Sequence, residues 1–196
     1  MEYALLGAAL GLIAIVPPGP VNVALIRLAA QRGPRPAIRG AAGIAAGDLT
    51  TVSIAVVIVG AGQSLPPTAF AISRLLAAGL LILTGVALLA RPSQCDALVD
   101  RIERPARTFY LLTSLAPTVL GAWIALLVAL PFADDLHALA WFASGVVVAS
   151  ALWHPLLAAG AGATRFRRWA TSGGVISRVG GLAMAALGVT ALVVQL

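Results

Sequence analysis

The stretch IVPPGPVNVALIRLAAQRG, residues 15–33, places three prolines and a glycine inside one of the most apolar parts of the chain. Pro17, Pro18 and Pro20 lack the backbone N–H that a helix uses, and their rings clash with the preceding helical turn. We therefore expect a helix to end at this stretch and a second helix to begin after Pro20.

Composition assigns the chain to the membrane. Its 196 residues are 60% hydrophobic and only 10% charged, whereas a soluble domain carries about 25% charged residues. Six apolar stretches are near or above the ~20 residues that a spanning helix needs. They are residues 3–26, 40–62, 68–90, 108–132, 137–161 and 174–196. The alternating pattern of membrane strands is absent, so we predict one all-α transmembrane domain over residues 1–196.

The arginines predict the topology. All 13 basic residues are arginine, and twelve of them lie between alternate pairs of apolar segments or, for Arg178, in the first turns of the last one. These twelve are Arg27, Arg32, Arg35 and Arg39, then Arg91, Arg101, Arg104 and Arg107, and finally Arg165, Arg167, Arg168 and Arg178. The opposite side holds only Arg74, with Glu2, Asp134 and Asp135. Because basic loops stay in the cytoplasm, we expect both termini outside a bacterial inner membrane, and no nucleic-acid partner.

The chain is predicted to contain two copies of one unit. ISRLLAAGLLILTGVALL from Ile72 resembles ISRVGGLAMAALGVTALV from Ile176, and GIAAGDLT from Gly43 corresponds to GVVVASAL from Gly145. Each unit has three segments, an odd number, so the second is inverted relative to the first. We expect three-helix repeats at 1–90 and 108–196, joined by a cytoplasmic linker, 91–107. Inverted repeats with interrupted helices are typical of transporters, whose substrate site lies at the repeat interface.

Polar residues of four segments are predicted to share one depth. Counting from the cytoplasmic ends at 1.5 Å per residue places Pro18 and Asp48 about 13 Å deep. The same count places Pro117 about 15 Å deep and His154 about 16 Å deep, near the centre of a ~30 Å hydrocarbon core. Irregular backbone at that depth must be buried in protein or line a cavity. The two proline breaks, in the first and fourth helices, therefore predict a midplane site.

The chemistry of that site follows from its residue types. A helix that begins after Pro20 presents free N–H groups near Val21 and Asn22, which suit a carboxylate. Asp48, an intramembrane acid, is a candidate for binding an ammonium group or carrying a proton. It lies at the edge of a face of small residues formed by Gly40, Gly43, Gly47 and Thr51. His154 either relays protons or satisfies a carbonyl freed by Pro155.

Other functions are less well supported by the sequence. One aspartate and one histidine are too few ligands for a metal-cation exporter, which remains the alternative. Cys95 is the only cysteine and cannot form a dithiol relay. The sequence shows no nucleophile–base pair that would indicate an enzyme, because Ser150 and His154 are four residues apart, the spacing of neighbours on one helix face. No cofactor is expected.

Glycine-rich faces of segments 68–90 and 174–196 fit either packing within the chain or a homodimer interface.

The region from Pro17 to Gly62 resembles the start of the LysE/RhtB family of amino-acid exporters. Its members carry Pro-Gly-Pro at the break of the first helix, matched by Pro18-Gly19-Pro20, and Gly-Asp in the second helix, matched by Gly47-Asp48. The segment TFYLLTSLAPTVLGAW resembles the family's fourth helix, and LGVTALV its ending. Many members have Asn-Pro in the fourth helix where this chain has Ala116-Pro117.

The resemblance implies a secondary exporter of amino acids or similar zwitterionic metabolites, driven by protons or the membrane potential. We expect the substrate to contact the two helix breaks and the acid between them, and protons to move through Asp48 and His154. The expected substrate-binding residues are Pro18, Gly19, Pro20, Val21, Asn22, Asp48, Pro117 and Thr118.

Overall fold

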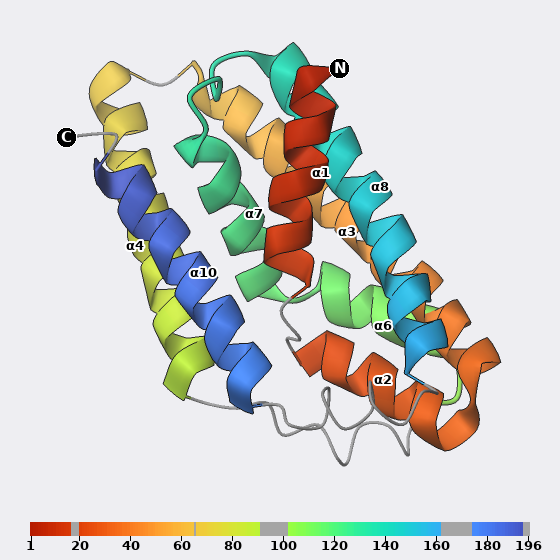
Figure 1. The fold of residues 1–196 in the computed structure, drawn as a ribbon. Coiled ribbons are helices and arrows are strands. Elements are labelled where there is room, and N and C mark those ends of the chain that lie inside the picture. Colours follow the sequence, from red (N-terminus) through yellow and green to blue (C-terminus); the bar gives the residue numbers. More distant parts are fainter. Residues whose placement is uncertain (17–19, 65, 91–101, 162–173, 194–196) are drawn as a thin grey trace.

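The structure is a computed structural model that describes residues 1–16, 20–64, 66–90, 102–161 and 174–193. Within these ranges the secondary structure is helical, and Figure 1 shows the helices as one bundle. The helices are α1 (Glu2–Ile15), α2 (Pro20–Arg32), α3 (Pro34–Gly62), α4 (Pro67–Ala90), α6 (Pro105–Ser114), α7 (Pro117–Ala129), α8 (Leu136–Gly160) and α10 (Gly174–Val193).

Two long helices, α3 and α8, pack against each other. α3 has 29 residues and α8 has 25, and each is long and apolar enough to cross a membrane. The pair α6 and α7, bent by 53° at its break, forms a third candidate span. The prediction of a multi-pass, all-α membrane protein is therefore confirmed at this level, and the expected number of six spans stays a prediction.

Two of the predicted spans are divided into half-helices. α1 ends at Ile15 and α2 begins at Pro20, while α6 ends at Ser114 and α7 begins at Pro117. In Figure 1, α1 ends and α7 begins partway along the length of the bundle, away from both of its ends. Ala116, at φ −77° and ψ 108°, is extended, as a residue before proline prefers. Each break thus follows from prolines inside an apolar run.

The basic segment at residues 27–39, expected as a loop, is helical apart from its turn. α2 continues to Arg32 and α3 begins at Pro34, with only Gly33 between them. Gly33 has φ +87°, which glycine adopts without a Cβ penalty, and proline is favoured at the first position of a helix. Arginine is a good helix former whose long side chain reaches water from a helix end.

Within the expected linker, residues 91–107, α6 already begins at Pro105. Proline again occupies the first turn of this helix. Residues 91–101 lie outside the described ranges. The described end of the linker therefore belongs to the first half-helix of the second predicted repeat.

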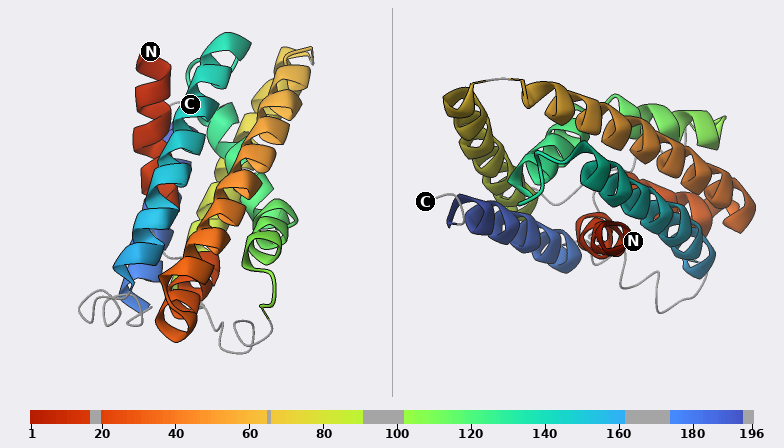
Figure 2. Two further views of the ribbon diagram at one scale, coloured as in Figure 1. Left: turned by 90° about the vertical axis from the view of Figure 1, so that its right-hand side faces the viewer. Right: turned by 90° about the horizontal axis from the view of Figure 1, so that it is seen from above.

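Small residues set the closest helix contacts. A Cβ added to Gly43 on α3 would overlap the carbonyl oxygen of Ala106 on α6, and one added to Gly145 on α8 would overlap that of Ala4 on α1. Figure 2 shows α1 standing beside α8. Because only glycine permits such backbone approach, these two residues let each long helix pack against a half-helix of the other half of the chain.

The pair α4 and α10 packs through glycines as well (Figure 2). A Cβ on Gly85 would lie 2.5 Å from the carbonyl oxygen of Gly181, and one on Gly188 would lie 2.8 Å from that of Ala78. The sequence left two uses open for the glycines on these segments, packing within the chain and a homodimer interface. Gly85, Gly181 and Gly188 serve packing within the chain.

Candidate functional site

The centre of the candidate site is Asp48 on α3. Its side chain is only 5% exposed, and the hydroxyl of Ser150 on α8 donates a hydrogen bond of 2.6 Å to its Oδ2. A buried carboxylate is unfavourable unless hydrogen bonds or charges compensate it. Because Gly43 and Gly47 form the α3 face that packs on α6, Asp48 at the edge of that face is turned toward α8.

Ser150 also connects Asp48 to His154. The Nδ1 of His154 lies 3.0 Å from Ser150 Oγ and 3.0 Å from the carbonyl oxygen of Ser150. A carbonyl oxygen only accepts, so Nδ1 carries the hydrogen in the second contact. Ser150 is fully buried and His154 is 2% exposed. The two residues predicted to handle protons are thus brought together, with a serine hydroxyl between them.

The position of His154 bears on the alternative of a purely structural role. In a helix the N–H of each residue bonds to the carbonyl four residues earlier. Pro155 has no N–H, so the carbonyl of Ala151 loses its usual partner. The ring instead contacts the hydroxyl and the carbonyl of Ser150. The contact with a backbone carbonyl beside the proline leaves both roles of His154, proton relay and structural partner, as predictions.

Thr51 lies one turn after Gly47 on the same helix and is fully buried. Its hydroxyl donates to the carbonyl oxygens of Gly47 and Asp48, at 3.0 and 3.2 Å. Such back-bonding is common for threonine in helices and occupies the hydroxyl within its own turn. The donor of Thr51 is thus engaged with the backbone that carries Asp48.

Asn22, in the first turn of α2, closes the first helix break. Its Nδ2 donates a hydrogen bond of 2.8 Å to the carbonyl oxygen of Ile15, the last residue of α1. The last four carbonyls of a helix have no partner within the helix, and Asn22 satisfies one of them. The predicted substrate residue therefore has a clear structural role, and its substrate contact stays a prediction.

The other expected binding residues lie at the two half-helix starts. Pro20 and Val21 begin α2, and Pro117 and Thr118 begin α7. Pro18 and Gly19 lie outside the described residues. The structure therefore places the start of a half-helix at each break, as predicted, and leaves the contact of these residues with a ligand untested.

Among the buried polar side-chain atoms without a hydrogen-bond partner in the described part of the chain, two bear on the site. They are Oγ1 of Thr113, next to the end of α6, and Nε1 of Trp153 on α8. Thr113 is 3% exposed, and a Cβ on Gly47, the neighbour of Asp48, would lie 2.7 Å from Thr113 Cβ. Buried polar groups in native proteins are usually paired, so these two atoms are candidates for ligand contacts.

Ser150 and Thr113 were not among the residues expected in the site. The signal for Ser150 was present, since aligning GIAAGDLT with GVVVASAL places Ser150 opposite Asp48. Thr113 has no comparable signal, because a threonine in an apolar helix usually bonds to its own backbone. Among the described residues, no group of three His, Cys, Asp or Glu side chains lies close enough to hold a metal ion.

Comparison with known proteins adds the family. Searches of curated proteins and of solved structures gave no match to the chain. The family model described as LysE type translocator matches residues 12–195, nearly the whole length. With its buried acid between two broken helices, the chain belongs to the LysE type translocator family.

Proposed function

We propose that the protein is a proton-coupled exporter of amino acids or similar small zwitterions across the bacterial inner membrane. Members of the LysE family are membrane transporters rather than enzymes, which gives the coarse function. The observation that carries the finer proposal is the buried Asp48–Ser150 hydrogen bond between the two halves of the chain. The metal-cation alternative is not favoured by the family.

The proposal includes alternating access by two inverted three-helix repeats, residues 1–90 and 108–196. It is supported by contacts that occur twice. The contacts Gly43–Ala106 and Gly145–Ala4 involve equivalent positions, because each residue of one contact stands 102 positions from its counterpart in the other. Asp48 and Ser150 are separated by the same 102 positions. A two-fold relation between the halves would therefore pass between these two side chains.

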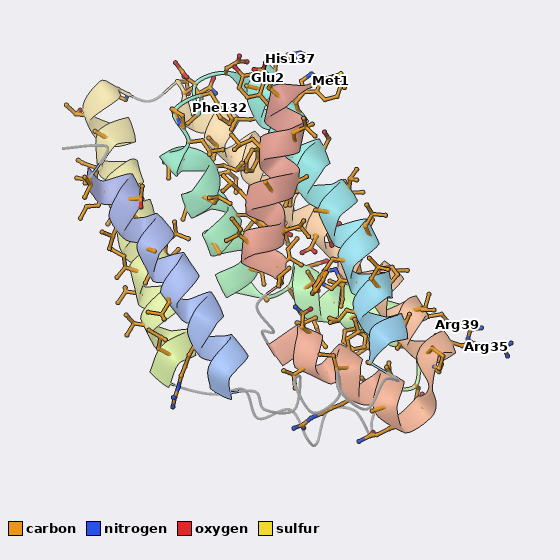
Figure 3. The ribbon with its side chains drawn as sticks, in the orientation of Figure 1. Met1, Glu2, Arg35, Arg39, Phe132 and His137 are labelled. Atoms are coloured by element: carbon orange, nitrogen blue, oxygen red, sulfur yellow. The ribbon has the colours of Figure 1, made fainter. Side chains whose placement is uncertain are left out.

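We further propose that both termini face the outside of the cell. In Figure 3, Met1, Glu2 and His137 lie at one end of the bundle, and Arg35 and Arg39 lie at the other. This distribution supports the proposal, because arginine-rich ends remain on the cytoplasmic side.

In the proposed mode of binding, the substrate lies at the two breaks beside Asp48. Its carboxylate would face the N–H groups at the start of α2 or α7, since the N-terminal end of a helix carries a partial positive charge. Thr113 and Trp153 would add side-chain donors, which their unpaired buried atoms support. Asp48 would receive the substrate ammonium or the exchanged proton.

The test is transport in proteoliposomes loaded with a panel of labelled amino acids, with a proton gradient imposed across the membrane. The Asp48→Asn variant keeps the size of the side chain and removes the acid. Thr51→Val is the matched control, because Thr51 is buried on the same helix and its hydroxyl bonds only to its own backbone in the described contacts.

We expect efflux of at least one amino acid by the wild type and by Thr51→Val, and loss of proton-driven efflux in Asp48→Asn. A folded wild-type protein that moves no amino acid would contradict the proposed substrate class. Unchanged proton-driven efflux in Asp48→Asn would contradict the role of the acid.

A further inference from the structure

We propose that Ser150 is a proton relay that carries protons between His154 and Asp48, and thereby joins the two halves of the exporter. This inference rests on the proposed proton-coupled function and deepens it. Ser150 was not among the residues expected to act. Among the described residues, its hydroxyl is the group that touches both titratable side chains of the buried cluster.

The geometry defines the direction of each hydrogen bond. Ser150 Oγ donates to Asp48 Oδ2 at 2.6 Å, so its single hydrogen is used there. The contact of 3.0 Å between Ser150 Oγ and His154 Nδ1 then has Nδ1 as donor. The contact with the Ser150 carbonyl requires the same donor. The three side chains thus form one continuous chain from Nδ1–H through O–H to the carboxylate.

Such a chain moves one proton without moving a heavy atom far. A hydronium ion gives a proton to Nε2 of His154 and becomes water, and the Nδ1–H bond breaks as its proton passes to Ser150 Oγ. The original Ser150 O–H bond breaks as its proton passes to Asp48 Oδ2. The products are histidine protonated at Nε2, an unchanged serine and a neutral aspartic acid. The O–H bond broken in hydronium is matched by the O–H bond formed on Asp48, so charge and atoms balance.

Serine suits this position because its hydroxyl donates and accepts at once. An alanine would leave a gap between Asp48 on α3 and His154 on α8, whereas a threonine would keep the hydroxyl. The chain also crosses from one predicted repeat to the other. A movement that separates α3 from α8 would break it, so proton transfer would occur only in the conformation that keeps the two helices together.

The other titratable groups belong to the surrounding helices. On the described parts of α1, α2, α3, α6 and α8 they are Glu2, Tyr3, Arg27, Arg32, Arg35, Arg39, Arg107, Tyr110 and His137. Tyr110 contacts Thr50 rather than Asp48, and Arg32 donates to the carbonyl of Ile102. His137 accepts a hydrogen bond from Trp141 at the exposed start of α8. The relay therefore consists of Asp48, Ser150 and His154.

The experiment compares Ser150→Ala and Ser150→Thr with the wild type in proteoliposomes. Two activities are measured with the panel of labelled amino acids: transport driven by a proton gradient, and exchange of labelled for unlabelled amino acid with no gradient. Exchange requires binding and the conformational change but no net proton transfer. Ser144→Ala is the matched control, because this exposed serine on the same helix donates only to the Trp141 carbonyl.

We expect Ser150→Ala to lose about 100-fold in proton-driven transport, the scale of a lost proton-transfer step, while exchange stays near the wild-type rate. Ser150→Thr and Ser144→Ala should retain both activities. Unchanged proton-driven transport in Ser150→Ala would overturn the relay. Equal loss of exchange and proton-driven transport would also overturn it, because Ser150 would then serve folding or substrate binding.

A second measurement does not depend on the substrate. The infrared band of the Asp48 carboxyl is identified as the band lost in Asp48→Asn, and its rate of protonation is followed after a rapid drop in pH. Ser150→Ala should slow this rate about tenfold or more, and Ser150→Thr should restore it. An unchanged rate would overturn the relay. If the wild type moves no amino acid, the proposed function fails, and this measurement still decides the relay.

Discussion

Asp48 on α3 and Ser150 on α8 are joined by a buried hydrogen bond of 2.6 Å, although they are 102 positions apart in the chain. The same separation relates the glycine contacts on either side of them, Gly43 with Ala106 and Gly145 with Ala4. Under the proposed repeat, the acid of one half thus takes its hydrogen bond from its counterpart in the other. Among the described contacts, this polar pair links α3 to α8 within apolar packing.

Exchanging the two residues tests this relationship. In Asp48→Ser/Ser150→Asp, one carboxylate and one hydroxyl still face each other, so we expect a folded protein. Ser150→Asp alone brings two carboxylates together in a buried site, which is strongly unfavourable unless they share a proton. Asp48→Ser alone leaves two hydroxyls. Residues in direct contact show coupling energies of about 0.5–3 kcal/mol, and we expect a favourable coupling in this range.

The coupling is measured as the free energy of unfolding of the wild type, both single variants and the double variant in detergent micelles. Additive effects of the two substitutions would show that the side chains do not interact in the folded protein. Asp48→Ser/Ser150→Ala provides the comparison in which the carboxylate is absent from both positions.

The closest glycine contacts predict a second set of effects. Gly145→Ala should lower stability by about 1–3 kcal/mol, the usual effect of overpacking, because the new Cβ would overlap the Ala4 carbonyl. Gly43→Ala should do the same against Ala106. The measurement is the midpoint of thermal unfolding in detergent.

Gly160→Ala is the control for these substitutions. It lies on α8, like Gly145, but beyond the nearby backbone of its own helix no described atom is within 4 Å of the position of its Cβ. It should be neutral or stabilising, since alanine is favoured over glycine in a helix by up to about 1 kcal/mol. A Gly145→Ala variant as stable as Gly160→Ala would contradict the close approach of α1 and α8.

The sequence predicts much of this arrangement because its signals are local. Prolines inside an apolar run indicate a break wherever they occur, so the divisions near Pro20 and Pro117 could be predicted. Composition predicts the membrane, and an intramembrane acid marks Asp48. The extension of α2 to Arg32 could not be read from hydropathy, because arginine ends an apolar run without ending a helix.

The partner of each polar group depends on packing between distant segments. Asn22 was expected to contact a substrate, and the sequence did not predict the hydrogen bond of its amide to the carbonyl of Ile15. Ser150 resembled an ordinary small residue until α3 was placed against α8. The hydropathy pattern predicts how deep a residue lies in the membrane, but not which neighbouring helix its side chain faces. The hydrogen bonds that join His154, Ser150 and Asp48 could therefore be identified only from the structure.

Asn22 provides a prediction that depends on pH. Asn22→Asp introduces a side chain of the same shape that can donate to the Ile15 carbonyl only while it is protonated. Ionisation places a carboxylate against a carbonyl oxygen, so the stability of this variant should fall as pH rises through the titration of the new acid. The wild type and Asn22→Ala should not show this added fall when thermal unfolding is followed from acidic to neutral pH. An identical pH profile for all three proteins would contradict the role of Asn22 at the break.

The start of α8 depends on a helix cap. Asp135 Oδ1 accepts hydrogen bonds from the backbone N–H groups of His137 and Ala138, at 2.9 and 3.0 Å. Asp135→Ala should therefore lower stability by about 1 kcal/mol, whereas Asp135→Asn should retain most of the cap. Asp134→Ala is the matched control, an exposed acid next in sequence whose side chain lies outside the cap. Equal thermal midpoints for Asp135→Ala and Asp134→Ala would show that the cap does not contribute.

Thr113 separates ligand binding from folding. Its buried hydroxyl has no partner in the described structure, so the isosteric change Thr113→Val removes no hydrogen bond from the empty protein. Stability should be unchanged or higher, because an unsatisfied buried polar group is itself unfavourable. If the hydroxyl donates to the substrate, KM for the transported amino acid should rise about threefold to tenfold, the equivalent of one hydrogen bond. The experiment measures thermal unfolding and the concentration dependence of exchange on the same preparations. A variant with wild-type KM would remove Thr113 from the substrate site, and one with lower stability would show that the hydroxyl has a structural partner.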